Sequence, residues 1–328
     1  MIRSTLSALV LTAVLVAPPA CGEGESQEAS PRADLQTPAE PAPLSPALDP
    51  AAVAAATGVS KPDTSSDGVV KVSFPRADVE VEVDGWKMPP FMGLTSWAAF
   101  TPGRAGVAEA MVMGDLVLFE DEVGPVMSAL LDAGLQVTAL HNHFFYDNPH
   151  VYFMHIGGEG TVAALGGGVQ QAMNTVKQLR TASPTPATSF GGPALPATSD
   201  LDPAPLAEVL GVKGTAKDGM FKAVLGRKVT AACGCTTGAA MGVNTWAAFA
   251  GTSDNAVVDG DFAVAEAELQ PVLKSLRTSG IFVVAIHHHM TGEQPRMLFL
   301  HYWGRGKAVE LAAAVRQALD LTAWDRPS

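Results

Sequence analysis

The sequence LQVTALHNH at residues 135–143 returns as IFVVAIHHH at residues 281–289. Each copy is an apolar, β-branched run that ends in a His-x-His pattern, and such runs are typical of buried strands. A glycine stands directly before each run, at Gly134 and Gly280, and apolar residues at helical spacing precede each glycine. Glycine is favoured where helices end. Helix, glycine and strand therefore follow one another twice in the same order, which predicts a duplicated fold unit.

The repeat continues on both sides of these stretches. On the C-terminal side, equivalent residues stay 146 positions apart, as in His155 and His301. On the N-terminal side the spacing widens in small steps, to 149 positions between Trp97 and Trp246. Such steps are expected where loops absorb insertions or deletions. The folded part of the chain is therefore predicted to be one domain written twice.

Each copy is predicted to be an α+β unit with the element order ββαββα, a ferredoxin-like α/β sandwich. We place the two domains at residues 48–181 and 201–324, related by a pseudo-twofold axis, with a Pro- and Ser-rich linker at 182–200. The last two strands of each unit are expected to form a hairpin, centred on Pro149 in the first copy and on Pro295 in the second.

The composition of the chain excludes some classes of protein. The chain has 328 residues, a length that fits about two domains, and its 47% hydrophobic content is enough for buried cores. Acidic residues outnumber basic ones by 33 to 21, and no basic stripe relieves the net charge of −12. Because such a surface repels phosphate backbones, nucleic acid is excluded as a partner. Three cysteines are too few for a disulfide-built scaffold.

The N-terminus has the pattern of an export signal. Met1-Ile2-Arg3 is a short basic start, an uncharged apolar run follows, and Ala20 stands before Cys21. We interpret residues 1–21 as a lipoprotein signal peptide with Cys21 as the lipidated residue, and an ordinary secretory signal is the alternative. Residues 22–47 are rich in Glu, Pro, Ala and Ser and are predicted to form a disordered tether. The expected location is the bacterial cell envelope, lipid-anchored at the outer membrane or the periplasmic face.

All eight histidines fall within two windows of the sequence, 141–155 and 287–301. Residues two apart on a strand share a face, so the first and third residues of each His-x-His pattern point the same way. The hairpin would place His143 opposite His155 and His289 opposite His301. Two triads of metal-ligating imidazoles are therefore predicted: His141, His143 and His155 in the first copy, and His287, His289 and His301 in the second.

Neutral imidazoles suit zinc first, and nearby methionines make copper the second choice. The alternative is that the histidines are half-buried strand residues bonded to the backbone or to one another. Glu120 and Glu266 also repeat, each where a helix is expected to begin. They are candidate general bases for a metal-bound water, although carboxylates at such positions usually interact with the free N–H groups of the helix. Cys233 and Cys235 occur only in the second copy, as a disulfide or as a soft metal pair.

The chain resembles the LppY/LpqO family of bacterial exported lipoproteins, a family of unknown function. The resemblance covers nearly all of residues 48–324 and is carried by segments of both copies: SWAAF at 96–100, MGDLVL at 113–118, TALHNH at 138–143, MHI at 154–156, GVNTWAAF at 242–249, HMTGE at 289–293 and FLHYWG at 299–304. It implies a cell-envelope location and the tandem architecture. It implies no reaction, cofactor or catalytic residue.

Three functions stay open from the sequence, and whether the protein is an enzyme is undecided. The first is a cell-envelope lipoprotein that binds a metal ion or small ligand through the duplicated histidines. The second is a metal-dependent hydrolase or lyase that uses a histidine-bound water, with Glu120 or Glu266 as the base. The third is a tethered structural protein without a metal. Beyond a membrane anchor on Cys21, the sequence identifies no partner.

Overall fold

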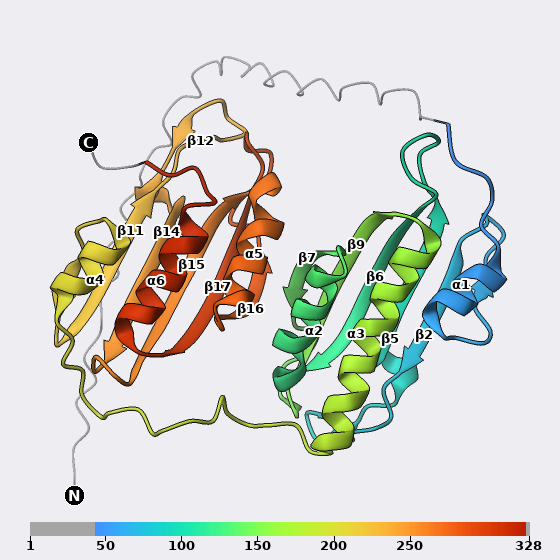
Figure 1. The fold of residues 1–328 in the computed structure, drawn as a ribbon, viewed down its shortest axis with the longest axis horizontal. Helices are drawn as coiled ribbons and strands as arrows, with labels where there is room; N and C mark the ends of the chain where they lie inside the picture. The colour runs from blue at the N-terminus through green and yellow to red at the C-terminus, as the bar shows by residue number, and fades with distance from the viewer. Residues whose placement is uncertain (1–42, 326–328) are drawn as a thin grey trace, which may run out of the picture. The chain divides into compact units, whose positions relative to one another are not determined.

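The computed structural model describes residues 43–325. The signal peptide predicted at 1–21, the lipidation site predicted at Cys21 and the tether as far as residue 42 lie outside this range. No helix of the described range is long and apolar enough to cross a membrane. The principal elements of the first copy (Figure 1) are α1 (Pro50–Thr57), β2 (Val70–Pro75), β5 (Thr95–Pro102), β6 (Ala110–Phe119), α2 (Glu120–Asp132), β7 (Gln136–His141), β9 (Val151–Gly160) and α3 (Val162–Ala182).

The second copy has the same elements in the same order. They are α4 (Pro203–Leu210), β11 (Met220–Gly226), β14 (Asn244–Gly251), β15 (Ala256–Ala265), α5 (Leu269–Thr278), β16 (Phe282–His287), β17 (Met297–Gly306) and α6 (Ala308–Leu319). The short strands are β1 (Asp63–Thr64), β3 (Glu82–Val83), β4 (Trp86–Lys87), β8 (Asp147–Asn148), β10 (Thr215–Lys217), β12 (Val229–Thr230) and β13 (Thr236–Thr237). Three 3₁₀ helices complete the described range: η1 (Pro90–Met92), η2 (Ala239–Met241) and η3 (Glu266–Glu268).

The fold is mixed α/β with a mainly antiparallel sheet. The run β5-β6-α2-β7-β9-α3 has the predicted order ββαββα, and each copy adds a leading helix and a further strand, β2 or β11, that the sequence analysis did not include. Strand order is β2-β5-β6-β9-β7 in the first copy and β11-β14-β15-β17-β16 in the second, which is the same order of equivalent strands. The duplication is thus present in the topology, while the narrower ferredoxin-like assignment stays a prediction.

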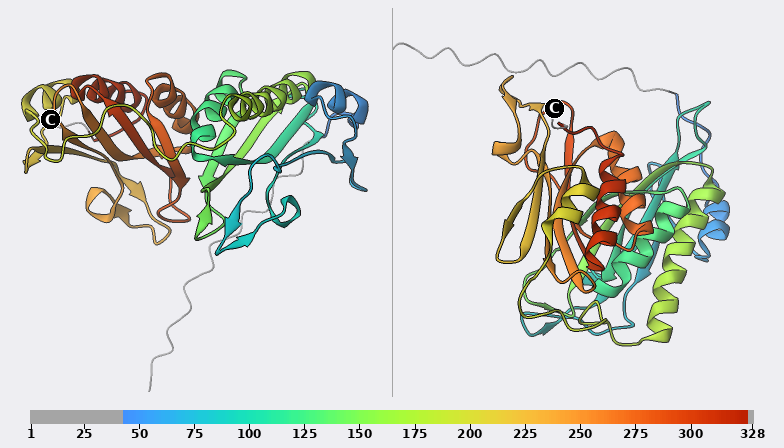
Figure 2. Two further views of the ribbon diagram at one scale, coloured as in Figure 1. Left: turned by 90° about the horizontal axis from the view of Figure 1, so that it is seen from below. Right: turned by 60° about the vertical axis from the view of Figure 1, so that its left-hand side comes forward.

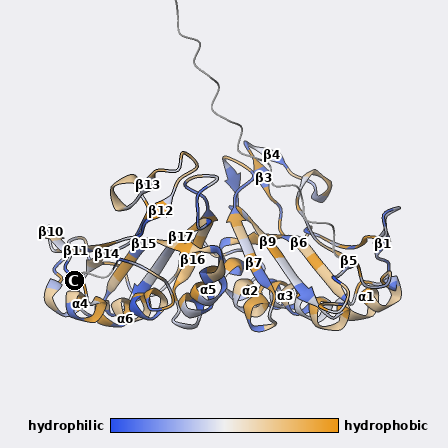
Figure 3. Cartoon of the chain, turned by 90° about the horizontal axis from the view of Figure 1, so that it is seen from above, coloured by the Kyte–Doolittle hydropathy of each residue, from blue (hydrophilic) through white to orange (hydrophobic). Residues whose placement is uncertain are grey.

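The helices of each copy lie along one face of its strands (Figure 2). The main core is between these helices and the sheet, where alternate strand residues such as Met154, Ile156, Leu300 and Tyr302 are buried. The opposite face is covered only locally, by the segments that carry β3 and β4 in one copy and β12 and β13 in the other (Figure 3). Smaller apolar clusters lie there, around Phe153 and around Phe299. Away from these clusters, the helix-free face is not covered by other elements of the described range, so polar side chains can lie on it.

The sheets of the two copies join through one pair of strands. β7 and β16 run antiparallel, and their register pairs Leu140 with Ile286, two residues that are equivalent in the repeat. The result is one sheet of twelve strands. The Gln270 side chain supports the junction, because its amide oxygen accepts from Val137 N–H at 3.0 Å and its amide nitrogen donates to Val137 C=O at 2.9 Å.

The segment between the copies contacts the first copy through Ala187, whose N–H donates to Asp121 Oδ2 at 3.1 Å, and it packs against the second. No helix or strand is present between Ala182 and Pro203. The centre of the Phe190 ring nevertheless lies 4.5 Å from the centre of the Phe282 ring, and Phe190 also packs beside Trp303. Arg305 donates to backbone carbonyls of this segment, and Asn255 Nδ2 donates to the Ala194 carbonyl at 2.8 Å. The linker therefore forms a wall over part of β16 and β17.

Candidate metal centre

Strand parity places the histidines on the helix-free face. Met154 and Ile156 point into the core, so His155 between them points to the other side of the sheet, and His301 does the same between Leu300 and Tyr302. The register differs from the predicted one. His155 lies opposite Ala139 in β7, and His301 lies opposite Ala285 in β16.

The prediction that His143 faces His155 and that His289 faces His301 is therefore wrong. β7 and β16 end at His141 and His287, so His143 and His289 lie beyond the strands, in the loops that lead to β9 and β17. In the first copy that loop is not a simple turn, because part of it forms β8 and pairs with β3. A tight hairpin centred on the proline is consequently absent there, and the two strands meet in a different register.

The rings of each predicted triad nevertheless lie close together, because diagonal neighbours on one sheet face are within reach. In the first copy, the ring centre of His141 is 5.1 Å from that of His143 and 5.1 Å from that of His155. In the second copy, the corresponding distances from His287 are 5.1 Å to His289 and 4.7 Å to His301. Each copy thus gathers its three rings on one patch of the sheet.

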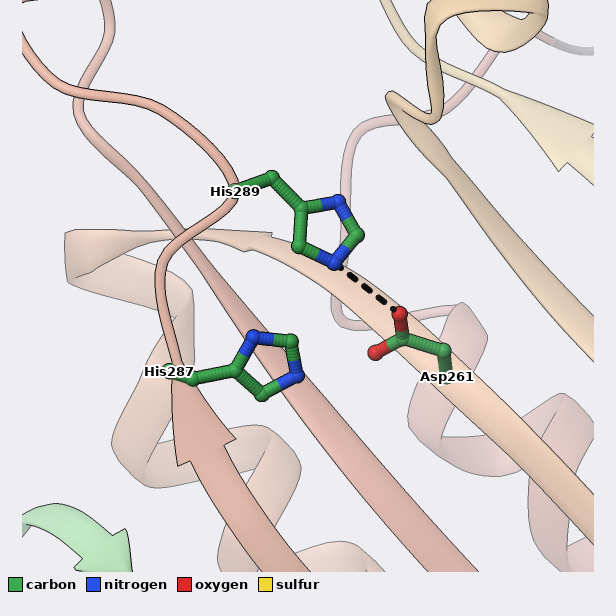
Figure 4. A group of neighbouring side chains, drawn as sticks. All are labelled: Asp261, His287 and His289. Atoms are coloured by element: carbon green, nitrogen blue, oxygen red, sulfur yellow. Dashed lines mark ion pairs between the residues drawn. The ribbon is translucent and has the colours of Figure 1, made fainter.

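An aspartate joins the patch in the second copy. Asp261 of β15 lies opposite His301 in the sheet, and its side chain faces the same side as the imidazoles (Figure 4). Asp261, His287 and His289 each offer a ligand atom, and these atoms lie within 4.8 Å of one another. His289 Nε2 is 3.5 Å from Asp261 Oδ2. This set could hold a metal ion, and it includes two of the three predicted histidines, with Asp261 in place of His301.

Two buried polar atoms of this ligand set have no hydrogen-bond partner within the described residues. Asp261 is only 3% exposed and its Oδ1 has no hydrogen-bond partner, and the buried Nε2 of His287 has none either. Desolvation raises the pKa of the Asp261 carboxyl despite the nearby His301 and His289, and it lowers the pKa of His287. Buried polar atoms normally have partners. A cation between Asp261 and His287 would supply one to both.

The first copy has the same residue types in a different arrangement. Asp115 lies opposite His155, and its Oδ1 is also buried without a partner. His141 Nε2 and His143 Nε2 are 3.2 Å apart, so one ring donates to the other. Within the described residues, the first copy does not bring three such ligand atoms within 4.8 Å of one another. The two patches are therefore related in composition and differ in geometry.

The candidate bases lie away from the ligand set. Glu120 is the first residue of α2, and Glu266 is the first of a short 3₁₀ helix at Glu266–Glu268. Both are exposed, and neither belongs to the ligand set of the second copy. The carboxylates that bond the helix starts are Glu122 and Glu268, which accept from the N–H groups of the residues three positions earlier at 2.9 and 2.8 Å.

Asp261 was not predicted as a ligand, and the state of Cys233 and Cys235 was left open by the sequence. Asp261 was recognisable only as a residue that repeats, with Asp115 as its equivalent. Cys233 and Cys235 are joined by a disulfide, in the segment between β12 and β13, which removes the alternative of a soft metal pair for these thiols. Their bond does not involve the histidine patches.

The first-copy histidines predict a pH effect on stability. Burial, with smaller contributions from the neighbouring rings, lowers the pKa of His141 and His143 below the usual 6.5, against the opposing pull of Asp115. The unfolded chain therefore takes up protons at these rings before the folded protein does. The free energy of unfolding should accordingly fall as the pH drops from about 6.5 towards 5.

Urea unfolding at pH 7 and pH 5 measures this effect. Replacing both rings with glutamine, which does not titrate, should flatten the pH dependence relative to the native chain. An equally steep fall in the double variant would place the effect on other groups.

Comparison with known proteins identifies a family without a known activity. A model of the family described as Domain of Unknown Function (DUF1259) matches residues 51–175 and 204–321, one segment in each copy. No curated protein matches the chain. A crystal structure of a trimeric bacterial microcompartment shell protein, PduB, covers 79% of this chain and 89% of its own, at 12% identity and a TM-score of 0.20. A score that low carries no argument, and the resemblance to the LppY/LpqO lipoproteins stays a prediction.

Proposed function

We propose that this chain, which belongs to the family described as Domain of Unknown Function (DUF1259), binds a divalent metal ion through Asp261, His287 and His289. The observation that carries the proposal is the pair of buried, unpartnered atoms in this set, Asp261 Oδ1 and His287 Nε2. Two imidazoles and one carboxylate are ligands that zinc accepts, and copper is the second candidate.

Three protein ligands leave a fourth tetrahedral position for water or a small ligand. This supports a binding protein that captures an ion or an ion-bound small molecule. The hydrolase or lyase alternative also needs a base close to the metal-bound water. Glu120 and Glu266, the bases predicted from the sequence, are exposed and lie outside the ligand set, so the binding role is the better supported of the two.

The proposed setting is the bacterial cell envelope, with the protein attached to a membrane by a lipid on Cys21. This part of the proposal rests on the sequence pattern of residues 1–21 alone. The histidine patch of the first copy is proposed as a weaker second site, through His141, His143 and His155. Its residue types repeat those of the second copy, but within the described residues it does not bring three ligand atoms within 4.8 Å of one another.

Zinc titration by calorimetry, on protein prepared without a polyhistidine tag, tests the assignment. His289→Ala should weaken the tighter zinc site by at least about a hundredfold, since even residues behind a ligand cost ten- to a hundredfold when removed. His288→Ala is the matched control. His288 is next to His289 in the sequence, but its ring bonds Arg296 and does not belong to the ligand set.

His143→Ala should leave the tighter site intact. The proposal is wrong if the native chain binds no zinc, or if His289→Ala and His288→Ala bind it equally well.

A further inference from the structure

A cleft of about 970 Å³ lies beside the metal centre. Its largely apolar wall comes from three parts of the chain: the linker, strands β16 and β17 of the second copy, and the start of α2 with Tyr152 in the first copy. The large apolar residues of the linker and of the second copy in this wall are Phe190, Leu195, Phe282, Val284 and Trp303. His301 also lines it, and the ring of His301 stacks on that of the ligand His287. Sites for small organic molecules typically have this size and this mostly apolar lining with a few polar groups.

Two arginines line the cleft without an acidic partner among the described residues, and they are Arg277 and Arg305. Both outer nitrogens of Arg305 donate to linker carbonyls. Arg277 of α5 lines the cleft, and the Phe282 ring lies beneath its guanidinium. Arg277 Nε donates to Ser128 Oγ at 3.2 Å and Nη1 donates to the Ile281 carbonyl at 2.8 Å. Within residues 43–325, no carboxylate forms an ion pair with it. Its burial without a counter-charge lowers the pKa of Arg277.

The packing around Arg277 holds its outer nitrogens in place. Gly124 of α2 faces the guanidinium, and a Cβ at that position would come within 2.9 Å of Nη2. A half-buried guanidinium without a carboxylate is unusual, because proteins pair buried charges. A second donor in the cleft wall, the buried indole N–H of Trp303, has no acceptor at all within the described residues. Both groups can only donate, so the missing partner is an acceptor.

The first copy lacks these features. At the repeat spacing of 146, Arg277 corresponds to Leu131, Phe282 to Gln136 and Trp303 to Gly157. His301, in contrast, corresponds to His155. The cation and the aromatic wall therefore occur beside one histidine patch only, although the histidines themselves occur in both. This is the pattern expected if the second copy serves a ligand that the first does not.

We propose that this cleft binds a small apolar organic acid, with its carboxylate on the Arg277 guanidinium and its hydrocarbon part against Phe190, Phe282 and Trp303. Guanidinium matches carboxylate in geometry and charge, which favours an acid over a neutral molecule of the same shape. The acidic residues of the lining do not oppose this. Glu120 and Asp259 are exposed to water, and Asp121 is paired with Arg180.

The positive charge proposed to bind the acid is that of Arg277, which is not a metal ligand. Binding in the cleft can therefore be tested separately from the proposed metal binding. Octanoate and 1-octanol serve as probes of equal chain length that differ in the acid group. Calorimetry should show octanoate binding to the native full chain at least about tenfold more tightly than octanol, since hydrogen bonds to charged groups are the stronger kind. Arg277→Gln should remove this preference and leave octanol binding unchanged.

Two variants serve as controls. Lys274→Gln removes an exposed positive charge from the same helix, outside the cleft lining, and should bind octanoate like the native chain. Phe190→Ser alters only the linker wall, so it keeps the proposal testable if Arg277→Gln does not fold, and it should weaken both probes. Asp261→Asn, and native protein treated with chelator, should bind octanoate normally while zinc binding is lost.

The proposal is overturned if octanoate fails to bind the native chain at millimolar concentration, or if octanol binds as tightly. It is also overturned if Arg277→Gln, being folded, retains the preference for the acid. Loss of zinc binding with octanoate binding intact would separate failure of the metal assignment from failure of the cleft.

Discussion

Glu122→Gln is expected to lower the free energy of unfolding by about 3 kcal/mol, the low end of the cost of removing one partner of a buried ion pair, because each arginine keeps a second carboxylate. Glu122 is fully buried and holds two buried arginines. Arg76 donates to its carboxylate at 2.7 and 3.0 Å, and Arg180 Nε lies 3.0 Å from it. The same carboxylate accepts the N–H of Phe119 at the start of α2. Neutral glutamine would remove the one carboxylate that the two guanidinium groups share, and would leave each with a single acidic partner, Asp78 for Arg76 and Asp121 for Arg180.

The second copy supplies the matched comparison. Its equivalent residue, Glu268, pairs with one arginine, Arg227, and the Glu268 side chain is 17% exposed where that of Glu122 is 0%. Glu268→Gln should therefore cost less, about 1–2 kcal/mol, because water reaches the pair. Urea unfolding of both variants at pH 7 measures the difference. Equal losses in the two copies would contradict the assignment of the larger cost to the second arginine.

Asp261→Asn is expected to change stability in opposite directions with and without zinc. In chelator-treated protein the native carboxylate is buried and one oxygen is unpartnered, which costs stability. Its pKa is raised by that burial, so the folded protein holds the ionised carboxylate less favourably than the unfolded chain does. Asparagine has the same shape without the charge. The variant should therefore be more stable than the native chain by about 1–2 kcal/mol at pH 8 without metal.

With zinc the order should reverse. An ion at about one hundred times its dissociation constant adds about 2.7 kcal/mol to a protein that binds it only when folded, and the variant would lose most of that gain. Thermal unfolding with chelator and with added zinc gives both values. Asp115→Asn is the matched control from the first copy: its Oδ1 is equally unpartnered, so the metal-free gain should appear, but the zinc response should stay native. A variant destabilised without metal, or one with an undiminished zinc response, would contradict the site.

The sequence predicts the duplication, the α+β class and the shared face of the histidines, because each depends on local spacing. The position of His143 relative to β9 could not be predicted from the sequence. The intervening loop pairs through β8 with β3, and contacts between segments that far apart leave no local pattern. Asp261 was missed for a similar reason. It lies on β15, and only the strand order places β15 beside β17 and hence beside the histidines.

The cleft was beyond the sequence for a different reason. Its outer wall is the linker, and a Pro- and Ser-rich stretch predicts flexibility and no docking site. The local signals were Phe190 and Leu195, two large apolar residues in a segment otherwise made of small residues, proline and polar residues. The packing of Phe190 on Phe282 depends on an aromatic residue that the first copy does not have, so the repeat comparison could not reveal it either.

The pairing of Leu140 with Ile286 joins two equivalent positions through the same strand edge of each copy. This is the contact that a symmetric homodimer makes, in which each subunit offers the same surface to the other. The chain is in this sense a dimer whose subunits have been fused. Fusion lifts the requirement that any substitution occur in both subunits at once. One half can then acquire Arg277 and Trp303 while the other keeps Leu131 and Gly157, and specialisation on one side leaves the shared interface unchanged.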